Sequence, residues 1–443
     1  DVALLKALAK AVMEQGNVDD DFISRYSDGY AGFKADIDNT DWQTLLNACG
    51  IPEADIRRVA RMYGQSKNAV FAWGMGMTHH LHGVDNIEYI SNLALLRGML
   101  GKQFAGLLPL RGHSNVQGIG TIGVKPVLPT DVFEKIEAHL GIRLPTGAGF
   151  DTLAGLEAAA NGGIDAALMM GGNLFAATPD RQFAERALDR IGFKLFLTTT
   201  LNLGHVHGVD NGEVLVLPVT ARDEEQQSTT QESMFNYVRL SDGGITRLAD
   251  VRPEVGILAD LGQRLLPDCG VDFEQYKQHQ HIRETIAATV PGMEDLADIS
   301  VAKREFHIRG RLLHTPEFKT ANGRAQFVVR PLPAALEDRN AYPFTVTTVR
   351  SEGQFNTIIY EEKDSYRGTS DRWSVLMNDD DIAALNLRAG DRVNLRSPHG
   401  EMRNALVYRY DLPRGDIMAY FPEANVLTGR RHDPRSKTPN FKS

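Results

Sequence analysis

Cysteine is almost absent from this 443-residue chain. Only Cys49 and Cys269 occur, far apart and outside any Cys-x-x-Cys pair. Two such residues cannot form a disulfide scaffold or a cysteine-built metal cluster. The sequence therefore excludes both kinds of framework within this chain and indicates a reducing compartment.

Long hydrophobic runs and an excess of basic charge are also absent. The longest apolar runs, such as FAWGMGM and VLVLPV, are much shorter than a membrane span. The net charge is -9, and no basic stripe with interleaved aromatic residues occurs, which argues against nucleic-acid binding. A composition of 42% hydrophobic and 24% charged residues is typical of a globular protein, and the length allows two to four domains.

The chain does not begin with methionine. Residue 1 is Asp, placed to cap an amphipathic helix, DVALLKALAKAVMEQG, whose apolar side carries Leu4, Leu5, Leu8 and Val12. We therefore expect this sequence to be a piece of a longer protein.

Helices and strands are predicted to alternate from about residue 50. A helix with Pro52 at its start and Gly64 past its end precedes the strand NAVFAWGMGM, and GVDNIEYISNLALLRGMLG then predicts a helix closed by Gly101. The pattern repeats in DTLAGLEAAANGG, IDAALMMGG, TPDRQFAERALDRIG and FKLFLTTT. Strands separated by single helices indicate an α/β fold with doubly wound parallel sheets.

The second half of the chain changes character. The polar stretch from Ala221 to Gly244 interrupts the alternation, and mostly helical sequence follows to about residue 300. The proline-rich stretch PLPAALEDRNAYP is the best domain boundary, and the short strands after it predict a small β-barrel.

Two histidine-containing segments resemble one another. HLHGVDN (80–86) and HVHGVDN (205–211) share six of seven positions, through either an internal repeat or chance. The His-x-His pairs, each followed by an aspartate, also allow an alternative function as a zinc-type hydrolase. Histidines that cap loops or satisfy buried backbone groups are commoner than metal ligands.

Four predicted loops are rich in glycine and small polar residues: WGMGMTHH, MMGGNL, TTTLNLGH and RGHSNVQG. Ligands of open α/β sheets bind beyond the carboxyl ends of the strands, where glycine lets the backbone approach them closely. Each loop alone is most simply an ordinary turn, but four together favour a large ligand such as a nucleotide or pterin. No GxGxxG or GxxxxGK[ST] motif occurs, so neither a dinucleotide fingerprint nor a Walker loop is supported.

Arg111 is the strongest candidate for substrate binding. Its guanidinium, at the end of a buried run, can hold a carboxylate or phosphate through two parallel hydrogen bonds. His113 can transfer a proton or polarise a bound oxygen. A structural ion pair of Arg111 is a comparable interpretation.

The motifs WGMGMTHHLHGVDN, ISNLALLRGMLGK and LPLRGHSNVQG resemble the molybdopterin-dependent oxidoreductases related to dimethyl-sulfoxide reductase, in particular the formate dehydrogenase-like alpha subunits. TTVRSEGQFNTIIYEEKDSYRG, VLMNDDDIAALNLRAGDRV, YFPEANVL and TPNFK resemble that branch's C-terminal domain. The resemblance spans nearly the whole chain. It implies three domains: the C-terminal part of one α/β cofactor-binding lobe at 1–115, a second α/β lobe at 116–335, and a double-psi β-barrel that binds cofactor at 336–443. The polar excursion near 221–244 would belong to the second lobe.

The resemblance implies a molybdenum or tungsten bis-molybdopterin guanine dinucleotide, and with it two groups of site residues. The catalytic pair would be Arg111 and His113, although some members have glutamine in place of His113. The cofactor-binding residues would be Trp73, Gly74, Met75, Gly76, Gly112, Asn115, Gln117, Gly172, Asn173, Thr199, Asn202, Arg350, Ser351, Gln354, Asn356, Thr357, Asn425 and Lys442.

The resemblance also implies parts that this chain lacks. Neither cysteine suits the family's [4Fe-4S] centre or its cysteine or selenocysteine ligand to molybdenum, so we expect both upstream of Asp1 and no metal ligand within this chain. The fragment alone is expected to be inactive. The expected activity is oxidation of formate or a similar small anion, with an electron-transfer subunit as partner; a non-catalytic scaffold is a further alternative. A cytoplasmic location is expected, with export of the folded enzyme as the other option.

Overall fold

The structure is a computed structural model that describes residues 1–311, 313–334 and 340–441. Lys442 and part of the predicted boundary at 331–343 lie outside these residues. No helix in the described part of the chain is both long and apolar enough to cross a membrane.

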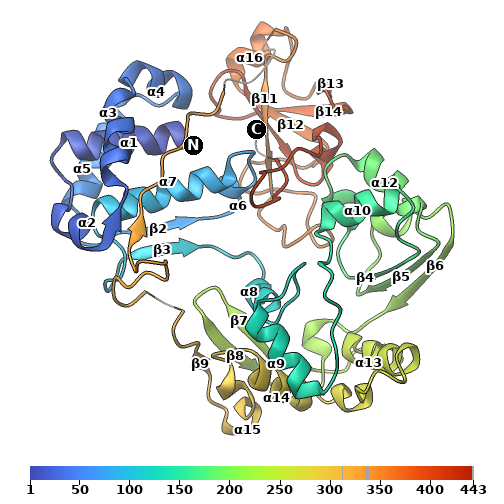
Figure 1. The fold of residues 1–443 in the computed structure, drawn as a ribbon. Coiled ribbons are helices and arrows are strands. Elements are labelled where there is room, and N and C mark those ends of the chain that lie inside the picture. The colour runs from blue at the N-terminus through green and yellow to red at the C-terminus, as the bar shows by residue number, and fades with distance from the viewer. Residues whose placement is uncertain (312, 335–339, 442–443) are drawn as a thin grey trace.

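The first lobe packs helices against a two-stranded parallel sheet (Figure 1). Its strands are β2 (Val70–Trp73) and β3 (Gly106–Pro109), and its helices are α1 (Val2–Glu14), α2 (Asp20–Tyr26), α3 (Tyr30–Asn39), α4 (Trp42–Cys49), α5 (Glu53–Gln65) and α7 (Gly83–Leu96). The core lies between α7 and α1 to α3, and includes Phe33, Tyr89 and Leu96.

Two details of this lobe differ from the sequence prediction. Helix α1 is not simply amphipathic: Lys6 is 2% exposed because α3 packs over it, and its Nζ bonds Asp36 Oδ2 at 2.8 Å. Gly64 lies inside α5 rather than past its end, at a position where a Cβ atom would collide with the side chain of Asn17. A pattern read along one helix cannot show which neighbours cover its other faces.

The second lobe contains a three-stranded parallel sheet in the order β4–β5–β6. The strands are β4 (Ala166–Met170), β5 (Phe193–Thr198) and β6 (Glu213–Pro218). Helices α10 (Thr152–Ala160) and α12 (Arg181–Asp189) pack on one face, and α13 (Glu254–Leu265) packs on the other. The α/β class with parallel sheets in two lobes is confirmed.

The polar excursion at 221–244 forms the antiparallel hairpin of β7 (Thr229–Ser233) and β8 (Tyr237–Ser241). Strand β9 (Phe306–His307) extends this hairpin. The helices packed around it are α9 (Thr130–Leu140), α14 (His279–Thr289) and α15 (Ile299–Ala302), with α8 (Val116–Thr121) against β7.

A short segment after this hairpin returns to the first lobe. Strand β10 (Ala325–Gln326) pairs in parallel with β1 (Ser27–Asp28), and Phe327 packs into the first lobe's core. Residues that we assigned to the second lobe therefore contact the first, and a two-residue strand gives no periodicity by which to predict this.

The C-terminal sheet has five strands in the order β11–β15–β12–β14–β13. They are β11 (Thr345–Val349), β12 (Ser374–Met377), β13 (Arg392–Arg396), β14 (Glu401–Arg409) and β15 (Asp416–Tyr420), with α16 (Asp379–Ala384) after β12. Pairs β11–β15 and β12–β14 are parallel, whereas β12–β15 and β13–β14 are antiparallel. Within the described residues the sheet is not a closed barrel, because β11 and β13 are its two edges and do not pair with each other.

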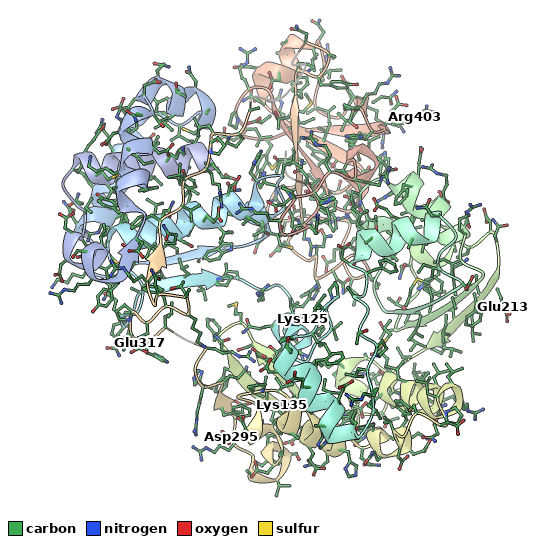
Figure 2. The ribbon with its side chains drawn as sticks, in the orientation of Figure 1. Lys125, Lys135, Glu213, Asp295, Glu317 and Arg403 are labelled. Carbon is green, nitrogen blue, oxygen red and sulfur yellow. The ribbon has the colours of Figure 1, made fainter. Side chains whose placement is uncertain are left out.

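The C-terminal part of the chain joins both lobes. Asp433 Oδ2 accepts a hydrogen bond from Val84 N at 3.1 Å at the start of α7. Arg181 Nη2 at the start of α12 donates to Pro422 O at 2.6 Å. Charged residues such as Glu213, Asp295, Glu317 and Arg403 are exposed and lie at the periphery (Figure 2). The C-terminal sheet thus lies beside the loops of both lobes.

Candidate functional site

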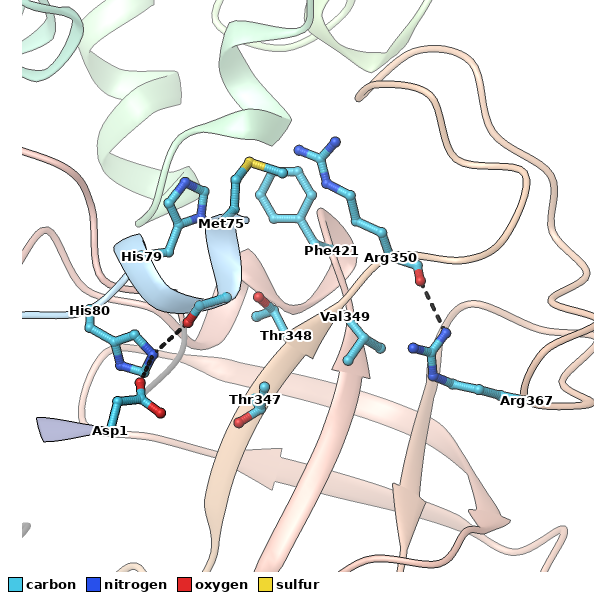
Figure 3. Close-up of a pocket in the computed structure, with 11 residues that line it drawn as sticks. Asp1, Met75, His79, His80, Thr347, Thr348, Val349, Arg350, Arg367 and Phe421 are labelled. Atoms are coloured by element: carbon cyan, nitrogen blue, oxygen red, sulfur yellow. Dashed lines mark hydrogen bonds and ion pairs between the residues drawn. The ribbon is translucent and has the colours of Figure 1, made fainter. Parts of the chain in front are cut away.

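A cavity of about 600 Å³ lies between the first lobe and the C-terminal sheet (Figure 3). One wall comes from α6 (Met75–Thr78) and the histidines after it, the other from the end of β11 and from Phe421. Its size suits a nucleotide-sized ligand. The lining residues are Asp1, Met75, Gly76, His79, His80, Thr347, Thr348, Val349, Arg350, Arg367 and Phe421.

Arg350 brings a positive charge to this cavity. Its side chain extends from the end of β11 over the ring of Phe421, with 4.9 Å between the guanidinium carbon and the ring centroid (Figure 3). Burial lowers the pKa of Arg350, and the nearby charge of Arg372 lowers it further. No ion pair between Arg350 and a carboxylate occurs in the described part of the chain, and none contributes to that pKa. An unneutralised, half-buried guanidinium is suited to an anionic ligand.

The first glycine-rich loop begins where β2 ends. Trp73 closes the strand, and Gly74 and Gly76 have open space around the position of a Cβ atom. Leu110 N donates to Trp73 O at 2.8 Å, which places the Arg111 loop beside this one. Of the predicted residues here, Met75 and Gly76 line the cavity, while Trp73 and Gly74 precede it.

The second lobe's predicted residues come together at the carboxyl ends of β4 and β5. Asn202 Nδ2 donates to Gly172 O at 3.2 Å, and Asn173 Oδ1 caps α11 (Leu174–Ala177) by accepting from Ala176 N at 3.0 Å. Gly172 has a φ of 75°, and it and Thr199 are exposed. These loops are adjacent and partly exposed, although none of them lines the cavity.

Arg111, Gly112 and His113 are exposed and lie outside the cavity. Arg111 N donates to the sulfur of Met234 at 3.4 Å. Two further predicted cofactor residues are engaged elsewhere: Asn115 Oδ1 accepts from Glu232 N at 2.9 Å, and Gln117 Nε2 donates to Glu232 Oε1 at 2.9 Å. Their amides hold α8 against β7, a structural role that the motif itself does not reveal.

The predicted residues of the C-terminal loop divide by what they contact. Arg350 lines the cavity, whereas Ser351 and Gln354 are buried. Asn356 Oδ1 closes a turn with Ile358 N at 2.7 Å, and Thr357 next to it is half-buried. Asn425 is fully buried and donates to Ala176 O at 2.7 Å, which ties the C-terminal part to the second lobe.

Sequence reasoning missed several residues of this region. Phe421 and Arg367 line the cavity, and Phe441 N donates to His79 O at 3.1 Å, which fixes the histidine wall. Arg372 is 1% exposed and bonds both Ser351 and Gln354. Only the sequence RWSVLM, in which an arginine lies two residues before a buried strand, could have signalled the role of Arg372.

The histidine pairs do not form metal sites. Within the described residues, no group of three or more histidine, cysteine or acidic side chains could hold a metal ion. His207 stacks on Phe175 with 4.3 Å between ring centroids and bonds Glu185 at 2.9 Å, while His82 bonds Asp85 at 3.2 Å. The segments 80–86 and 205–211 also differ in structure, since Gly83 begins α7 whereas Gly208 lies in a turn with a φ of 69°. The likeness of the two segments in sequence therefore does not extend to their local structure.

Comparisons with known proteins agree with this geometry. Residues 344–443 match the molydopterin dinucleotide binding domain. Over its full length, the chain is 34% identical to an uncharacterized oxidoreductase of Mycobacterium tuberculosis (strain ATCC 25618 / H37Rv), of which it covers 60%, and 30% identical to Protein YdeP of Escherichia coli (strain K12), of which it covers 62%. It is 27% identical to the F420-dependent formate dehydrogenase subunit alpha of Methanocaldococcus jannaschii, of which it covers 67%. The chain thus spans about 60% of the length of its more similar relatives.

The fold has a counterpart among solved structures. Acetylene hydratase from Pelobacter acetylenicus aligns over 99% of this chain and 66% of its own, with a TM-score of 0.67 and 14% sequence identity. With the dinucleotide-binding domain and the oxidoreductase relatives, this likeness confirms the resemblance seen in the motifs. The chain thus carries a molydopterin dinucleotide binding domain at residues 344–443 and is similar over its full length to proteins named as oxidoreductases.

Proposed function

We propose that the complete protein is a molybdopterin guanine dinucleotide-dependent oxidoreductase that oxidises a small anion, with formate as the first substrate to test. The observation that carries this proposal is the unneutralised guanidinium of Arg350 beside a cavity of about 600 Å³ between the first lobe and the dinucleotide-binding domain. A pyrophosphate is the anion that such a cofactor would bring to Arg350. The relatives named as oxidoreductases and formate dehydrogenase subunits support the reaction class.

The residues of this chain fit one dinucleotide at the cavity and leave a second surface for another. Met75, Gly76 and Arg350 would hold the first, because the glycine admits the cofactor closely and the arginine meets its charge. Gly172, Thr199 and Asn202 would contact the second at the ends of the second lobe's strands. When bound, the metal of this cofactor would accept the two electrons released by the substrate.

Arg111 would hold the substrate and His113 would handle its proton. The exposed guanidinium of Arg111 can pair with the two oxygens of a formate carboxylate and orient its C–H bond. Oxidation of formate breaks that bond and yields carbon dioxide, two electrons and one proton. The His113 imidazole, two residues from Arg111, can take this proton.

The remaining parts of the proposal concern the rest of the protein. A [4Fe-4S] centre and the cysteine or selenocysteine ligand to the metal would come from a part of the polypeptide outside this chain, because Cys49 and Cys269 are far from the cavity loops in sequence and neither lines the cavity. An electron-transfer subunit would take the electrons onward. We propose a cytoplasmic location.

Metal and nucleotide analysis of the complete polypeptide, purified without oxygen, tests the proposal. Molybdenum or tungsten together with GMP released by acid hydrolysis, and formate-dependent reduction of an artificial dye, is the expected result. Zinc without guanine nucleotide would contradict the cofactor and favour the hydrolase alternative. Cofactor without formate turnover would retain the family chemistry and reject formate.

A further inference from the structure

We propose that Arg372 is a positioning residue that fixes the loop 350–354, so that the guanidinium of Arg350 stays free to meet the cofactor's phosphates. This inference rests on the proposed function, because it assigns Arg372 a role in the same cofactor site. Arg372 does not line the cavity and was not among the residues predicted from the sequence.

The side chain of Arg372 holds the loop directly. It is 1% exposed, its Nη1 donates to Ser351 Oγ at 2.6 Å, and its Nη2 donates to Gln354 Oε1 at 3.1 Å. These two side chains were predicted to bind cofactor, but their polar atoms point inward to Arg372. They therefore act on a ligand through the shape of the loop, while Arg350 between β11 and Ser351 is left at the cavity.

The same guanidinium links the loop to Phe421, which lies on the same wall of the cavity, and to Glu423 after it. Nη2 donates to the carbonyl of Phe421 at 2.7 Å, and Nε and Nη2 donate to the two carboxylate oxygens of Glu423 at 2.8 and 3.0 Å. Tyr360 and Tyr420 contact its faces at 4.4 and 5.0 Å from their ring centroids. This set of contacts needs a planar fork with several donors, which lysine does not provide.

The two arginines divide the local charge between them. Glu423 neutralises Arg372 in a two-point ion pair, and Arg372 in turn lowers the pKa of Arg350. The positive charge that remains uncompensated at the cavity is that of Arg350. Without Glu423, the two close guanidiniums would repel each other more strongly, and without Arg372, the loop that carries Arg350 would lose one of its two anchors.

A second anchor holds the far end of this segment. Asp364 is fully buried and accepts from Arg367 Nη1 and from Tyr420 Oη, both at 2.8 Å. Arg367 Nη1 also donates to the carbonyl of Arg350 at 3.1 Å, a bond drawn in Figure 3. Removal of Arg372 should therefore loosen the loop without releasing it, because Arg367 still holds the Arg350 carbonyl and Asp364 still accepts from Glu352 N.

The test uses Arg372→Lys in the complete polypeptide, with Arg403→Lys as the matched control. Arg403 lies in the same sheet, is 78% exposed and bonds Glu401 at 2.6 Å, far from the cavity lining. Three quantities are compared for each variant: GMP per mole of protein, the unfolding temperature of cofactor-free protein, and the rate of trypsin cleavage after Arg350, Lys363 and Arg367 in cofactor-free protein.

We expect Arg372→Lys to be cleaved after Arg350 about tenfold faster than the wild type. We also expect it to retain about a tenth of the wild-type GMP, the factor that corresponds to a loss of about 1.4 kcal/mol in cofactor binding. Its cofactor-free unfolding temperature should stay within a few degrees of that of Arg403→Lys, and Arg403→Lys should match the wild type in all three quantities.

Three results would overturn the inference. Unchanged cleavage means that Arg372 does not hold the loop, and faster cleavage with full GMP means that the loop does not position the cofactor. A large fall in the unfolding temperature, with normal GMP in the folded fraction, means that the role is structural.

If Arg372→Lys does not fold, Ser351→Ala removes a single acceptor of the same guanidinium, and cleavage at the wild-type rate would then reject the inference. Absence of GMP from the wild type would reject the proposed function, while the cleavage rates would still decide whether Arg372 holds the loop.

Discussion

Arg350 and Arg111 both follow a strand in a loop singled out by the same resemblance, yet their surroundings differ. Arg350 is half-buried beside a cavity, and contacts within this chain determine its loop. Arg111 is exposed, and its backbone N–H donates to the sulfur of Met234. Side chains of this chain therefore hold the loop of the proposed cofactor arginine, whereas the proposed substrate arginine is placed through its backbone.

This difference predicts that substitutions at the two arginines change different measured quantities. Substitutions around Arg350 should change cofactor retention, and substitutions at Arg111 should change turnover without changing retention. Four changes test or refine this division, and we give them in order of decreasing expected effect.

Arg111→Ala in the complete protein should reduce formate turnover by about a hundredfold or more, because the substrate loses its two-point contact and its orientation. Molybdenum and GMP contents should match those of the wild type. Steady-state kinetics with metal analysis of the same preparations measures both. Loss of molybdenum from this variant would show that Arg111 is structural and would remove the contrast with Arg350.

Asp433→Ala should weaken the junction between the first lobe and the C-terminal part. Asp433 is 1% exposed and accepts hydrogen bonds from the N–H groups of Val84, Arg435 and Ser436. Leaving buried donors unpaired should lower the free energy of unfolding by about 1–3 kcal/mol. Denaturant unfolding would measure this free energy, with Asp379→Ala as the control. Asp379 is 67% exposed and pairs with an equally exposed Arg409, so its loss should have little effect. Equal effects of the two variants would mean that the junction does not depend on Asp433.

The loop around Arg350 should loosen at high pH. Burial, aided by the nearby charge of Asp364, raises the pKa of Tyr420 to about 12. Because the folded-state pKa lies above the unfolded value near 10, the contribution of Tyr420 is complete below pH 10 and is lost as the pH rises towards 12. Absorbance titration of tyrosinate should lose one group titrating near pH 12 in Tyr420→Phe. An unchanged titration curve would show that Tyr420 is not buried beside Asp364.

His207→Ala should have the smallest effect. The ring stacks on Phe175 and bonds a half-exposed Glu185, so its loss should cost about 1 kcal/mol or less of stability and should leave the metal content unchanged. Elemental analysis of His207→Ala and His82→Ala, prepared in parallel, would check this. Loss of bound metal from both variants is what the zinc hydrolase alternative requires.

The sequence predicted the elements that local patterns define. Strands β2, β4 and β5 were found because short apolar runs end in glycine or threonine, and the loops after them were placed correctly at the strands' carboxyl ends. The resemblance supplied Met75, Gly76 and Arg350, which do line the cavity. Neighbouring parallel strands bring such loops together without further information.

Contacts between distant residues could not be predicted in this way. Arg372 bonds residues that are 21 and 51 positions away in the sequence. Strand β10 pairs with β1 although most of the sequence of the two lobes lies between them. Asn115 and Gln117 carry the same amides whether they bind a cofactor or a hairpin, and only the position of Glu232 shows that they bind the hairpin here. Residue type and spacing indicate chemistry, whereas the partner of each polar group depends on the tertiary fold.

The most direct test of the central claim is the GMP content of Arg350→Ala in the complete protein. If Arg350 supplies the uncompensated charge that holds the dinucleotide, this variant should release at most about a tenth of the wild-type GMP, a loss of about 1.4 kcal/mol in binding. The unfolding temperature of its cofactor-free form should match that of the wild type, since no ion pair of Arg350 is broken within the described residues. Wild-type amounts of GMP in Arg350→Ala would contradict the account and place the cofactor elsewhere.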